Sequence, residues 1–337
     1  MKQAPPMEKT PEVWVVTAYR AGERAQVLAL AEALGWPFKV KEVLHKPCAW
    51  RTNLLRGSDL SGTDLSASDA LEAPWPDLLI SAGMRNEPVC RWIREQSAGR
   101  CKIVHIGRPW AKLENFDLVV TTPQYRLPRR DNVLQNTTTL HRVTQARLQQ
   151  AAADYKALFE ALPGPCIAVI IGGNSGPFTL GKHAARRLAE HCNALAESRQ
   201  ASLLITTSSR TSAAAVKALQ TAIKVPAYTY FWEKGKKDNP YYAFLAMADE
   251  LVVTADSISM LTEACATGKP VHMFDPGVGK QAMRRHPLAT GRNDFHLSGL
   301  SYRLMMALGP QRLSRDIRLV HDSLLAEGRA VWLGDNF

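Results

Sequence analysis

The chain has 337 residues, of which 46% are hydrophobic and 22% charged, a balance typical of soluble globular proteins. This length favours two domains of roughly 150 residues each, and no apolar run approaches the ~20 residues that a membrane-spanning helix needs. The net charge of +11 indicates an anionic partner, such as a phosphate-bearing ligand, an acidic lipid surface or a nucleic acid.

Cysteine and histidine patterns predict no metal centre and no resident cofactor. The six cysteines form no CxxC pair, and the nine histidines show no HxxxH or HExxH spacing. Aromatic residues do not alternate with the basic clusters, which argues against binding of nucleic acid. The polar, proline-rich N-terminus is unlike a signal peptide, so we expect a cytoplasmic protein, with peripheral attachment to the inner face of the membrane as a further possibility.

The first domain is expected over residues 12–162. A buried strand at Val13–Thr17, a helix from Glu23 to Leu34 that stops at Gly35, and a strand at Phe38–Val43 form a βαβ unit, which implies a parallel sheet. Further strands are expected at 77–81, 102–106 and 117–120, with a helix at 88–96. Residues 45–75 show no core pattern and are predicted to be an irregular loop.

Polar loops follow nearly every strand of this half, so they share the sheet edge at which ligands of parallel sheets bind. Arg20 and Arg85 come from these loops, as do Arg108 and Arg126. They are either a shared anion site or simply solvated surface.

The second half starts after Pro163-Gly164-Pro165, which breaks a helix predicted over 143–162 and is taken as the domain boundary. We expect the second domain over residues 163–310. Its predicted strands are 167–171, 203–207, 227–232, 251–253 and 272–274, and its predicted helices are 180–199, 212–222 and 241–248. Residues 311–337 are expected to be helical and to pack back on the first domain.

Two loops of this half have the composition of phosphate sites. Gly172-Gly173-Asn174-Ser175-Gly176 directly follows a buried strand, and successive amides in such a turn form an anion nest. Ser209-Arg210-Thr211 combines hydroxyls and a guanidinium at a strand-to-helix junction. The alternative for the second loop is a plain Ser/Thr cap of the following helix.

Residues 252–271 predict a strand, a polar turn, a helix and a second strand. Asp256 or Ser257 is expected to cap the helix, and Gly268 to end it. At 100° per residue one face of the helix is apolar, formed by Ile258, Leu261 and Cys265, and the opposite face is polar, formed by Asp256, Ser259 and Glu263. A helix that starts at the carboxyl end of a strand is a ready ligand site, although an ordinary half-exposed helix has the same pattern.

These motifs together resemble those of known families. The Gly-Gly loop and the helix bearing Ser257 and Glu263 are similar to the donor domain of the muramyl-pathway N-acetylglucosaminyltransferase. A fuller resemblance, over most of residues 13–280, is to the mitochondrial-fission ELM family, whose bacterial members are regarded as candidate glycosyltransferases. It is carried by Arg20-Ala21-Gly22 with Gln26, LLISAGMR at 78–85, IGGNSG at 171–176 with TTSSRT at 206–211, DNPY at 238–241, and VTADSISMLTEACATGKPV at 253–271.

The resemblance implies an α/β fold of GT-B type, with two Rossmann-like domains whose parallel sheets face each other across a cleft. It also implies that the second domain holds a nucleotide-sugar. In that reading Glu263 accepts from the ribose hydroxyls. Phosphate is held by Gly172, Gly173, Asn174, Ser175, Ser209, Arg210 and Thr211. Ser257, Ser259 and Met260 flank the base or phosphate, and Gln281 reaches the sugar.

The acceptor side is assigned to Arg20, Gly22, Gln26 and Arg85, with Glu23 as candidate catalytic base. A glutamate in a first helical turn is also favoured simply by the helix dipole. The chain departs from the bacterial pattern here, since Glu23-Arg24-Ala25 replaces a His-Asp-Asn-like sequence and Gly107-Arg108-Pro109 replaces Gln-Asp-Pro. A different acceptor or base, or loss of activity, would follow.

The leading hypothesis is therefore a metal-independent glycosyltransferase that moves a sugar from a nucleotide-sugar to a cell-envelope saccharide or lipid-linked acceptor. Its partners would be these two substrates and an acidic membrane surface. Two alternatives stay open, a catalytically idle scaffold of the same fold attached to a membrane or partner, and a nucleotide-sugar epimerase.

Overall fold

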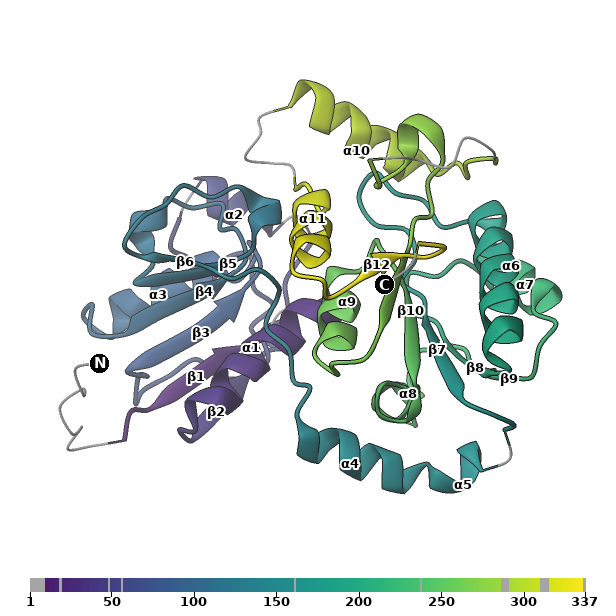
Figure 1. The fold of residues 1–337 in the computed structure, drawn as a ribbon. Coiled ribbons are helices and arrows are strands. Elements are labelled where there is room, and N and C mark those ends of the chain that lie inside the picture. Colours follow the sequence, from purple (N-terminus) through teal and green to yellow (C-terminus); the bar gives the residue numbers. More distant parts are fainter. Residues whose placement is uncertain are drawn as a thin grey trace. The chain divides into compact units, whose positions relative to one another are not determined.

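The protein contains two α/β units, each built on its own parallel sheet (Figure 1). The structure is a computed structural model and describes residues 10–17, 20–47, 49–55, 57–160, 162–236, 238–285, 291–309 and 315–335. Unit 1 comprises Met1–Arg142 and unit 2 comprises Val143–Phe337. Each sheet has six strands, and all the strand pairs are parallel, so the expected fold class of two Rossmann-like domains is confirmed.

Unit 1 arranges its sheet in the order β2-β1-β3-β4-β5-β6. Its strands are β1 (Val13–Val16), β2 (Phe38–Lys41), β3 (Leu78–Ala82), β4 (Lys102–Ile106), β5 (Leu118–Thr121) and β6 (Val133–Gln135). Its helices are α1 (Ala21–Leu34), α2 (Trp50–Leu55) and α3 (Glu87–Gln96), with 3-10 turns η1 (Leu113–Asn115) and η2 (Pro123–Tyr125).

Both faces of this sheet are buried because side chains alternate along each strand. Val13 and Val15 of β1 lie in one core cluster with Val27 of α1. Trp14 and Val16 lie in the other, with residues of α3. The unbroken apolar run of β1 is therefore the sequence signature of a strand covered on both sides.

Unit 2 arranges its sheet in the order β12-β11-β10-β7-β8-β9. Its strands are β7 (Cys166–Ile170), β8 (Ser202–Thr206), β9 (Ala227–Tyr230), β10 (Glu250–Thr254), β11 (Val271–Phe274) and β12 (Val331–Trp332). Its helices are α4 (Gln145–Asp154), α5 (Lys156–Phe159), α6 (Lys182–Arg199), α7 (Ala213–Ala222), α8 (Tyr241–Met247), α9 (Ile258–Cys265), α10 (Leu297–Leu308) and α11 (Arg318–Ala326), with the 3-10 turn η3 (Gly279–Gln281).

The central strand β7 separates two cores of unit 2. Ile167 and Val169 pack with α6 and α7, whereas Ala168 and Ile170 pack with α8, α9 and α11. The predicted apolar face of α9 is confirmed, because Ile258, Leu261 and Cys265 all lie in the second of these cores.

The strand order fixes where each sheet has its topological switch point. In unit 1 the chain passes from β1 to β2 on one side and later returns to β3 on the other. In unit 2 it passes from β7 to β8 and returns to β10. Loops after β1 and β3, and after β7 and β10, therefore diverge at the carboxyl edges, where open parallel sheets bind ligands.

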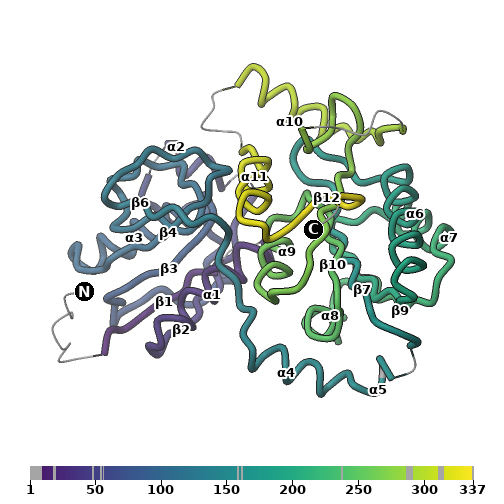
Figure 2. Tube along the Cα trace, in the orientation of Figure 1, coloured from purple at the N-terminus to yellow at the C-terminus, as the bar shows by residue number. Residues whose placement is uncertain are grey.

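The boundary between the units differs from the expected one at 162/163. The chain divides after Arg142 instead, because the 143–162 segment, which forms α4 and α5, belongs to unit 2. Leu148 and Ala151 of α4 pack on the core that contains α8, and Figures 1 and 2 show α4 beside α8. Pro163-Gly164-Pro165 is instead the turn into β7, where Gly164 has φ +71° against the Gln200 carbonyl.

The C-terminal segment, which we expected to pack back on the first domain, belongs to unit 2. Val320 and Leu324 of α11 are fully buried in the core of unit 2. β12 extends the sheet of that unit beside β11. Residues 311–314, 336 and 337 of the predicted helical segment lie outside the described residues.

Residues 45–75 are ordered by local contacts, although the sequence predicts an irregular loop there. His45 and Thr63 form a β-bridge, and the Lys46 amide donates to the Gly62 carbonyl at 2.9 Å. Asn53 of α2 donates to the Met84 carbonyl at 3.0 Å and so ties this segment to the loop after β3.

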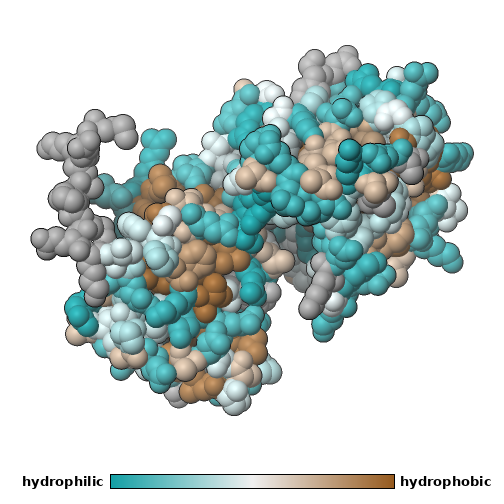
Figure 3. All heavy atoms as spheres, turned by 90° about the horizontal axis from the view of Figure 1, so that it is seen from below, coloured by the Kyte–Doolittle hydropathy of each residue, from teal (hydrophilic) through white to brown (hydrophobic). Residues whose placement is uncertain are grey.

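Figure 3 shows one face on which hydrophilic residues predominate and hydrophobic residues form separate groups. Among the helices that the structure describes, none has both the length and the apolarity to cross a membrane.

Candidate functional site

The candidate site lies at the switch point of the unit 2 sheet, where the loops after β7, β8 and β10 meet. The Gly172 amide donates to the Thr254 hydroxyl at 2.8 Å, and the Gly173 amide donates to Asp256 Oδ2 at 3.1 Å. The glycine loop and the loop after β10 are thereby held together. This bond pattern follows from β7 and β10 being neighbours in the sheet.

A buried ion pair joins the third loop to this group. Arg210 Nη1 lies 2.8 Å from Asp256 Oδ2 and also donates to the Asn174 carbonyl at 3.3 Å. The Asp256 side chain is completely buried, whereas 36% of the Arg210 side chain is exposed. Arg210 therefore reaches the site as expected, but one edge of its guanidinium is already occupied by a carboxylate of the protein.

Burial raises the pKa of Asp256, and the neighbouring Arg210 only partly opposes this rise. Asp256 Oδ1 is buried and has no hydrogen-bond partner among the described residues. The carboxyl is thus a buried and only partly hydrogen-bonded group at the centre of the site, and the cation beside it favours its charged form.

The two glycines are needed for the approach of this ion pair. A Cβ at Gly172 would collide with the Asp256 carboxylate and the Arg210 guanidinium. Gly173 has φ +150°, and a Cβ there would collide with the Arg210 carbonyl. The sequence predicts that a ligand approaches the backbone of these glycines closely. In this structure the side chain of Asp256 and the residue Arg210 occupy that position.

Hydroxyl groups fix the loop after β8. Thr211 Oγ1 donates to the Gly172 carbonyl at 2.6 Å, and the Ser208 hydroxyl donates to the same oxygen. The alternative of a simple helix cap holds for Ser212, which accepts from the Ala215 amide at 3.2 Å. Ser209 is exposed and lies at the rim of a pocket.

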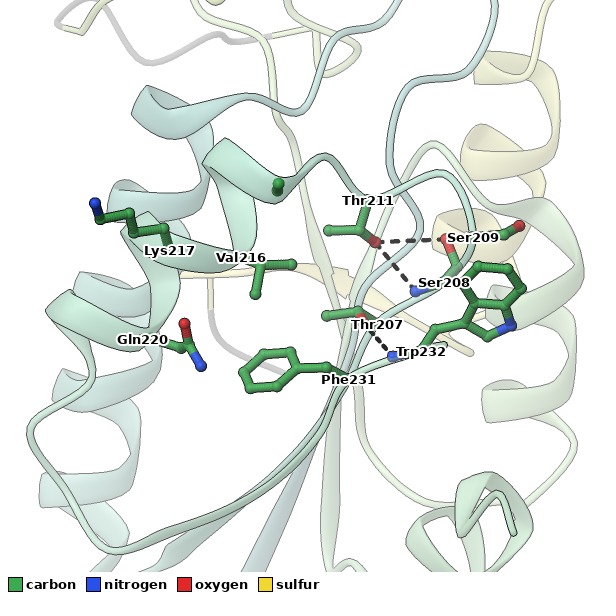
Figure 4. Close-up of a pocket in the computed structure, with 10 residues that line it drawn as sticks. Thr207, Ser208, Ser209, Thr211, Val216, Lys217, Gln220, Phe231 and Trp232 are labelled. Carbon is green, nitrogen blue, oxygen red and sulfur yellow. Dashed lines mark hydrogen bonds between the residues drawn. The ribbon is translucent and has the colours of Figure 1, made fainter. Parts of the chain in front are cut away.

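That pocket, open and about 610 Å³ in volume, lies between the loop after β8, α7 and the end of β9. In Figure 4 Val216, Gln220 and Phe231 gather at one end and Ser209 and Trp232 at the other. Aromatic, hydroxyl and amide groups share its wall, a mixture that suits a flat polar ring. Its lining comprises Thr207, Ser208, Ser209, Thr211, Ala213, Val216, Lys217, Gln220, Phe231 and Trp232.

Helix α9 starts at Ser257, but neither proposed cap is made. The Ser257 side chain forms no capping bond, and Asp256 instead points to Gly173 and Arg210. The cap prediction is therefore wrong, because the ion pair competes for the carboxylate. Ser259 and Met260 are half-buried on this first turn.

Glu263 lies further along α9 and is 9% exposed. The Tyr241 hydroxyl, at the start of α8, donates to Glu263 Oε2 at 2.6 Å. Burial and this carboxylate raise the pKa of Tyr241 well above its usual value. Glu263 is thus less exposed to solvent than helical periodicity predicts for a residue on the polar face, because α8 packs over it.

The remaining predicted donor residues lie around the start of α6. Asn174 Oδ1 accepts from the Leu180 amide at 2.9 Å, and Ser175 Oγ accepts from Arg315 at 2.8 Å. Gln281 is exposed and its Oε1 accepts from Arg303 at 2.9 Å.

The N-terminus of α6 is occupied by a carboxylate of the chain. Asp294 accepts from the amides of Gly181 at 3.1 Å, His183 at 3.1 Å and Ala184 at 2.9 Å. This helix end follows the glycine loop and is where an anion would be expected to bind. Asp294 satisfies it instead.

In unit 1 the predicted acceptor-side residues gather at the β1/β3 switch point. Arg20 and Glu23 form an ion pair at 3.4 Å, and Gln26 donates to the Gly22 carbonyl at 3.1 Å. Gly83, with φ +84°, brings the loop after β3 beside Glu23, since a Cβ there would lie 3.0 Å from Glu23 Oε2. Arg85 is half-buried in the same loop.

Asn86 joins this second group, although no role is predicted for it from the sequence. Its amide donates to the carbonyls of Thr17 and Ala82, both at 3.1 Å, and its Oδ1 lies 2.7 Å from His45 Nε2. The ends of β1 and β3 are thereby fixed. Burial lowers the pKa of His45 and so favours the neutral ring, whereas the hydrogen bond to Asn86 acts in the opposite direction.

Among the residues that the structure describes, no cluster of three or more His, Cys, Asp or Glu side chains has the arrangement of a metal site. Each switch point instead contains an ion pair of its own, Arg210 with Asp256 in unit 2 and Arg20 with Glu23 in unit 1.

Residues 21–290 match the family model described as mitochondrial fission ELM1, which covers most of the chain. The chain belongs to the mitochondrial fission ELM1 family. The family assignment expected from the sequence motifs is confirmed. The match begins after β1 and Arg20, includes the loop after β3 and the whole switch point of unit 2, and ends before α10.

Two relatives resemble the chain over much of its length. The mitochondrial fission protein ELM1 of Arabidopsis thaliana is 30% identical over 239 residues, which are 64% of this chain and 55% of the plant protein. The chain thus matches about half the length of the plant protein. An uncharacterized protein of Rickettsia prowazekii is 24% identical over 301 residues, 78% of this chain and 83% of that protein.

Several solved structures resemble this chain at low sequence identity. The glycosyl transferase family 9 protein of Veillonella parvula is 11% identical, with a TM-score of 0.49 over 96% of this chain and 99% of that chain. UDP-GlcNAc 2-epimerase of Neisseria meningitidis, bound to UDP-GlcNAc, is 12% identical, with a TM-score of 0.46 over 94% and 91%. E. coli ADP-heptose lps heptosyltransferase II is 14% identical, with a TM-score of 0.45 over 94% and 99%. With TM-scores below 0.5, they carry no argument about activity.

Three site residues were underestimated from sequence. Asp256 is predicted from sequence as a helix cap or part of a polar helix face, although its position directly after a buried strand is a signal for the switch point. Tyr241 belongs to the DNPY motif, but its bond to Glu263 depends on packing between α8 and α9. Asp294 is the single acidic residue between Gly277 and Arg315, which could have marked it as a specific contact.

Proposed function

We propose that the protein is a glycosyltransferase of GT-B type that binds a nucleotide-sugar at the switch point of unit 2. The observation that carries the proposal is the convergence of the glycine loop, Arg210 and the start of α9 on one point of the sheet edge. Parallel sheets bind phosphate-bearing ligands at such points. The net charge of +11 favours the same class of ligand.

The donor would be divided among three neighbouring features. The pocket with Ser209, Gln220 and Trp232 offers stacking and hydrogen bonding to a base. Arg210, which is still one-third exposed, and the free amides at the start of α9 would face the phosphates. Glu263 would accept from ribose hydroxyls after exchanging its bond with Tyr241, and Gln281 would reach the sugar.

Transfer requires stabilisation of the departing nucleotide, on which negative charge develops. Arg210 and the α9 N-terminus supply fixed positive potential for that charge, the role that a divalent metal fills in other transferases. The acceptor, a cell-envelope saccharide or lipid-linked sugar, would be deprotonated by Glu23 with Arg20, Gly22, Gln26 and Arg85 around it.

A second candidate is a catalytically idle scaffold, and a specific observation favours it. The groups that would hold the donor are already satisfied within the chain, Arg210 by Asp256 and Glu263 by Tyr241. The family name describes organelle fission and no reaction. In this reading the switch point is a rigid polar core.

Calorimetric titration with UDP-, GDP-, CMP- and dTDP-sugars separates the two candidates. A donor site predicts binding of at least one of them, and Glu263→Ala should weaken it by about 1.5–3 kcal/mol. Glu250→Ala is the matched control, because this carboxylate lies at the start of β10, the opposite end of the strand that leads into the site. If no nucleotide-sugar binds at millimolar concentration, the scaffold is the remaining candidate function. Binding without turnover would remove Glu23 from its catalytic role.

A further inference from the structure

Helix α10 exposes a stripe of leucines to solvent. Leu297, Leu300, Leu304 and Leu308 are 71%, 48%, 59% and 80% exposed, and Phe295 just before the helix is 71% exposed. At 100° per residue the four leucines fall within an arc of about 80°. We call these five residues the leucine stripe. A scattered exposed leucine is ordinary, but an aligned row on one helix face is not.

The opposite face of α10 holds the helix to the candidate donor site. Gly299 is buried, and Tyr302 lies against Gly176 of the glycine loop. Arg303 donates to the Pro177 carbonyl at 3.2 Å and to Gln281 Oε1 at 2.9 Å. The outward direction of the leucine stripe is therefore set by specific inner contacts of the same helix.

The chain around α10 is strongly basic. Between Gly277 and Arg315 it has seven Lys or Arg residues and one acid, Asp294. That acid is engaged with the amides of α6. Lys280 and Arg292 are exposed and, among the described residues, have no carboxylate partner within ion-pair distance. Apolar side chains on one helix face with flanking cations complement the acyl boundary and headgroups of an anionic bilayer.

We propose that α10 docks unit 2 on an anionic membrane surface, with the leucine stripe inserted at the level of the headgroups. Because Tyr302 and Arg303 contact the loop that follows β7, docking brings the rim of the switch point to the bilayer. This interaction does not depend on whether a nucleotide-sugar binds. It would, however, present a lipid-borne acceptor if the proposed function holds.

The test is sedimentation of the full-length protein with vesicles of phosphatidylcholine alone and of phosphatidylcholine with phosphatidylglycerol, without nucleotide. We expect binding to the anionic vesicles that is weakened by 0.5 M NaCl. The double variant Leu300→Ser/Leu304→Ser should weaken it about tenfold or more, since both side chains lose their inserted area. Lys280→Glu/Arg292→Glu should weaken it at low salt.

The control is Leu65→Ser/Leu134→Ser, whose leucines in unit 1 are 60% and 50% exposed and so match Leu304 and Leu300. This variant should bind vesicles like the unchanged protein. Hydrogen exchange gives a local readout that folding defects would not imitate, since vesicles should slow exchange within 297–308 specifically.

Three outcomes would overturn the proposal. They are no binding of the unchanged protein to anionic vesicles, equal binding by the stripe variant, and a dimer that the stripe variant converts to monomer in the absence of vesicle binding. The last would identify the stripe as a contact between two copies of the chain. Nucleotide titration is a separate measurement, so the vesicle-binding result can be interpreted even if the proposed function is wrong.

Discussion

Asp256 and Arg210 couple three loops through one ion pair. The Asp256 side chain is inaccessible to solvent, and its Oδ2 accepts from both Arg210 and the Gly173 amide. Removal of the cation would leave a buried carboxylate with only part of its partners. Such a loss costs more than the pair contributes when intact, because the desolvation is no longer compensated.

Arg210→Ala should therefore lower the free energy of unfolding by about 1–3 kcal/mol at pH 7. The expected loss is less than for a fully buried pair because Arg210 is partly exposed. Urea unfolding followed by circular dichroism measures it. Arg199→Ala, which removes the more exposed pair with Glu250, should cost about 0–1 kcal/mol. Equal losses in the two variants would mean that the Asp256 pair has no special role.

Two buried histidines should make stability fall in mild acid. Burial lowers the pKa of His105 to about 3 and of His321 to about 4. Since the unfolded value is about 6.5, both stabilise the folded state above pH 6.5, and this stabilisation is lost progressively as the pH falls. At pH 5.5 the loss is about 1.4 kcal/mol for each ring.

His105→Leu tests the larger shift. Both ring nitrogens of His105 are buried without hydrogen-bond partners among the described residues, so the variant should be no less stable at pH 7.5 and should lose less stability by pH 5. Thermal unfolding across this range measures the effect, with the exposed His296→Leu as control. The comparison also separates His105 from buried carboxyls such as Glu87, whose raised pKa acts in the opposite direction. Parallel pH curves would refute the assignment.

At this scale the sequence predicts which residues come together better than what they contact. The glycine loop, Arg210 and the Asp256–Glu263 stretch follow strands of one parallel sheet, so their meeting was predictable. Their partners were not, because the Tyr241–Glu263 and Arg210–Asp256 contacts join side chains that are 22 and 46 residues apart. The sequence pattern alone does not show whether such a side chain contacts another residue of the chain or a ligand.

Helix α6 shows the same difference at the scale of an element. Its position after the glycine loop was predicted, but its first amides are capped by Asp294, more than 100 residues later in the chain. This cap ties the basic segment before α10 to the sheet.

Asp294→Ala should destabilise unit 2 by about 1–2 kcal/mol, because three helix amides lose their acceptor. Faster hydrogen exchange in the first turn of α6 would locate the effect. Asp322→Ala provides the control, since its partner Arg285 is 79% exposed and the pair is weak. Unchanged exchange at 181–184 would show that the cap contributes nothing.

Strands covered on both faces were the elements predicted best, because a short unbroken apolar run indicates a strand that is buried on both sides. The short edge strands β6 and β12 and helix α10 were missed. β6 and β12 have only three and two residues. The apolar residues of the leucine stripe in α10 are not buried in a core. Helical periodicity alone does not show which face of this helix contacts the protein.

For the whole molecule, the boundary after Arg142 predicts which fragments fold. The fragment 143–337 should unfold cooperatively on heating and retain near-ultraviolet circular dichroism, because it contains both cores of unit 2. The fragment 163–337, cut at the boundary expected from sequence, should be markedly less stable. It lacks Leu148, Ala151 and Tyr155, which pack on α8 and its neighbours. Equal stability of the two fragments would restore the boundary at 162/163.

The late position of β12 has a consequence for synthesis of the chain. Unit 1 is complete once Arg142 has left the ribosome, whereas the sheet of unit 2 gains its last strand about 190 residues later, at Trp332. At the usual rate of 5–20 residues per second, this is an interval of roughly 10–40 s. Unit 1 can therefore fold while unit 2 is still being translated, with β11 as an open edge that a chaperone could cover until β12 arrives.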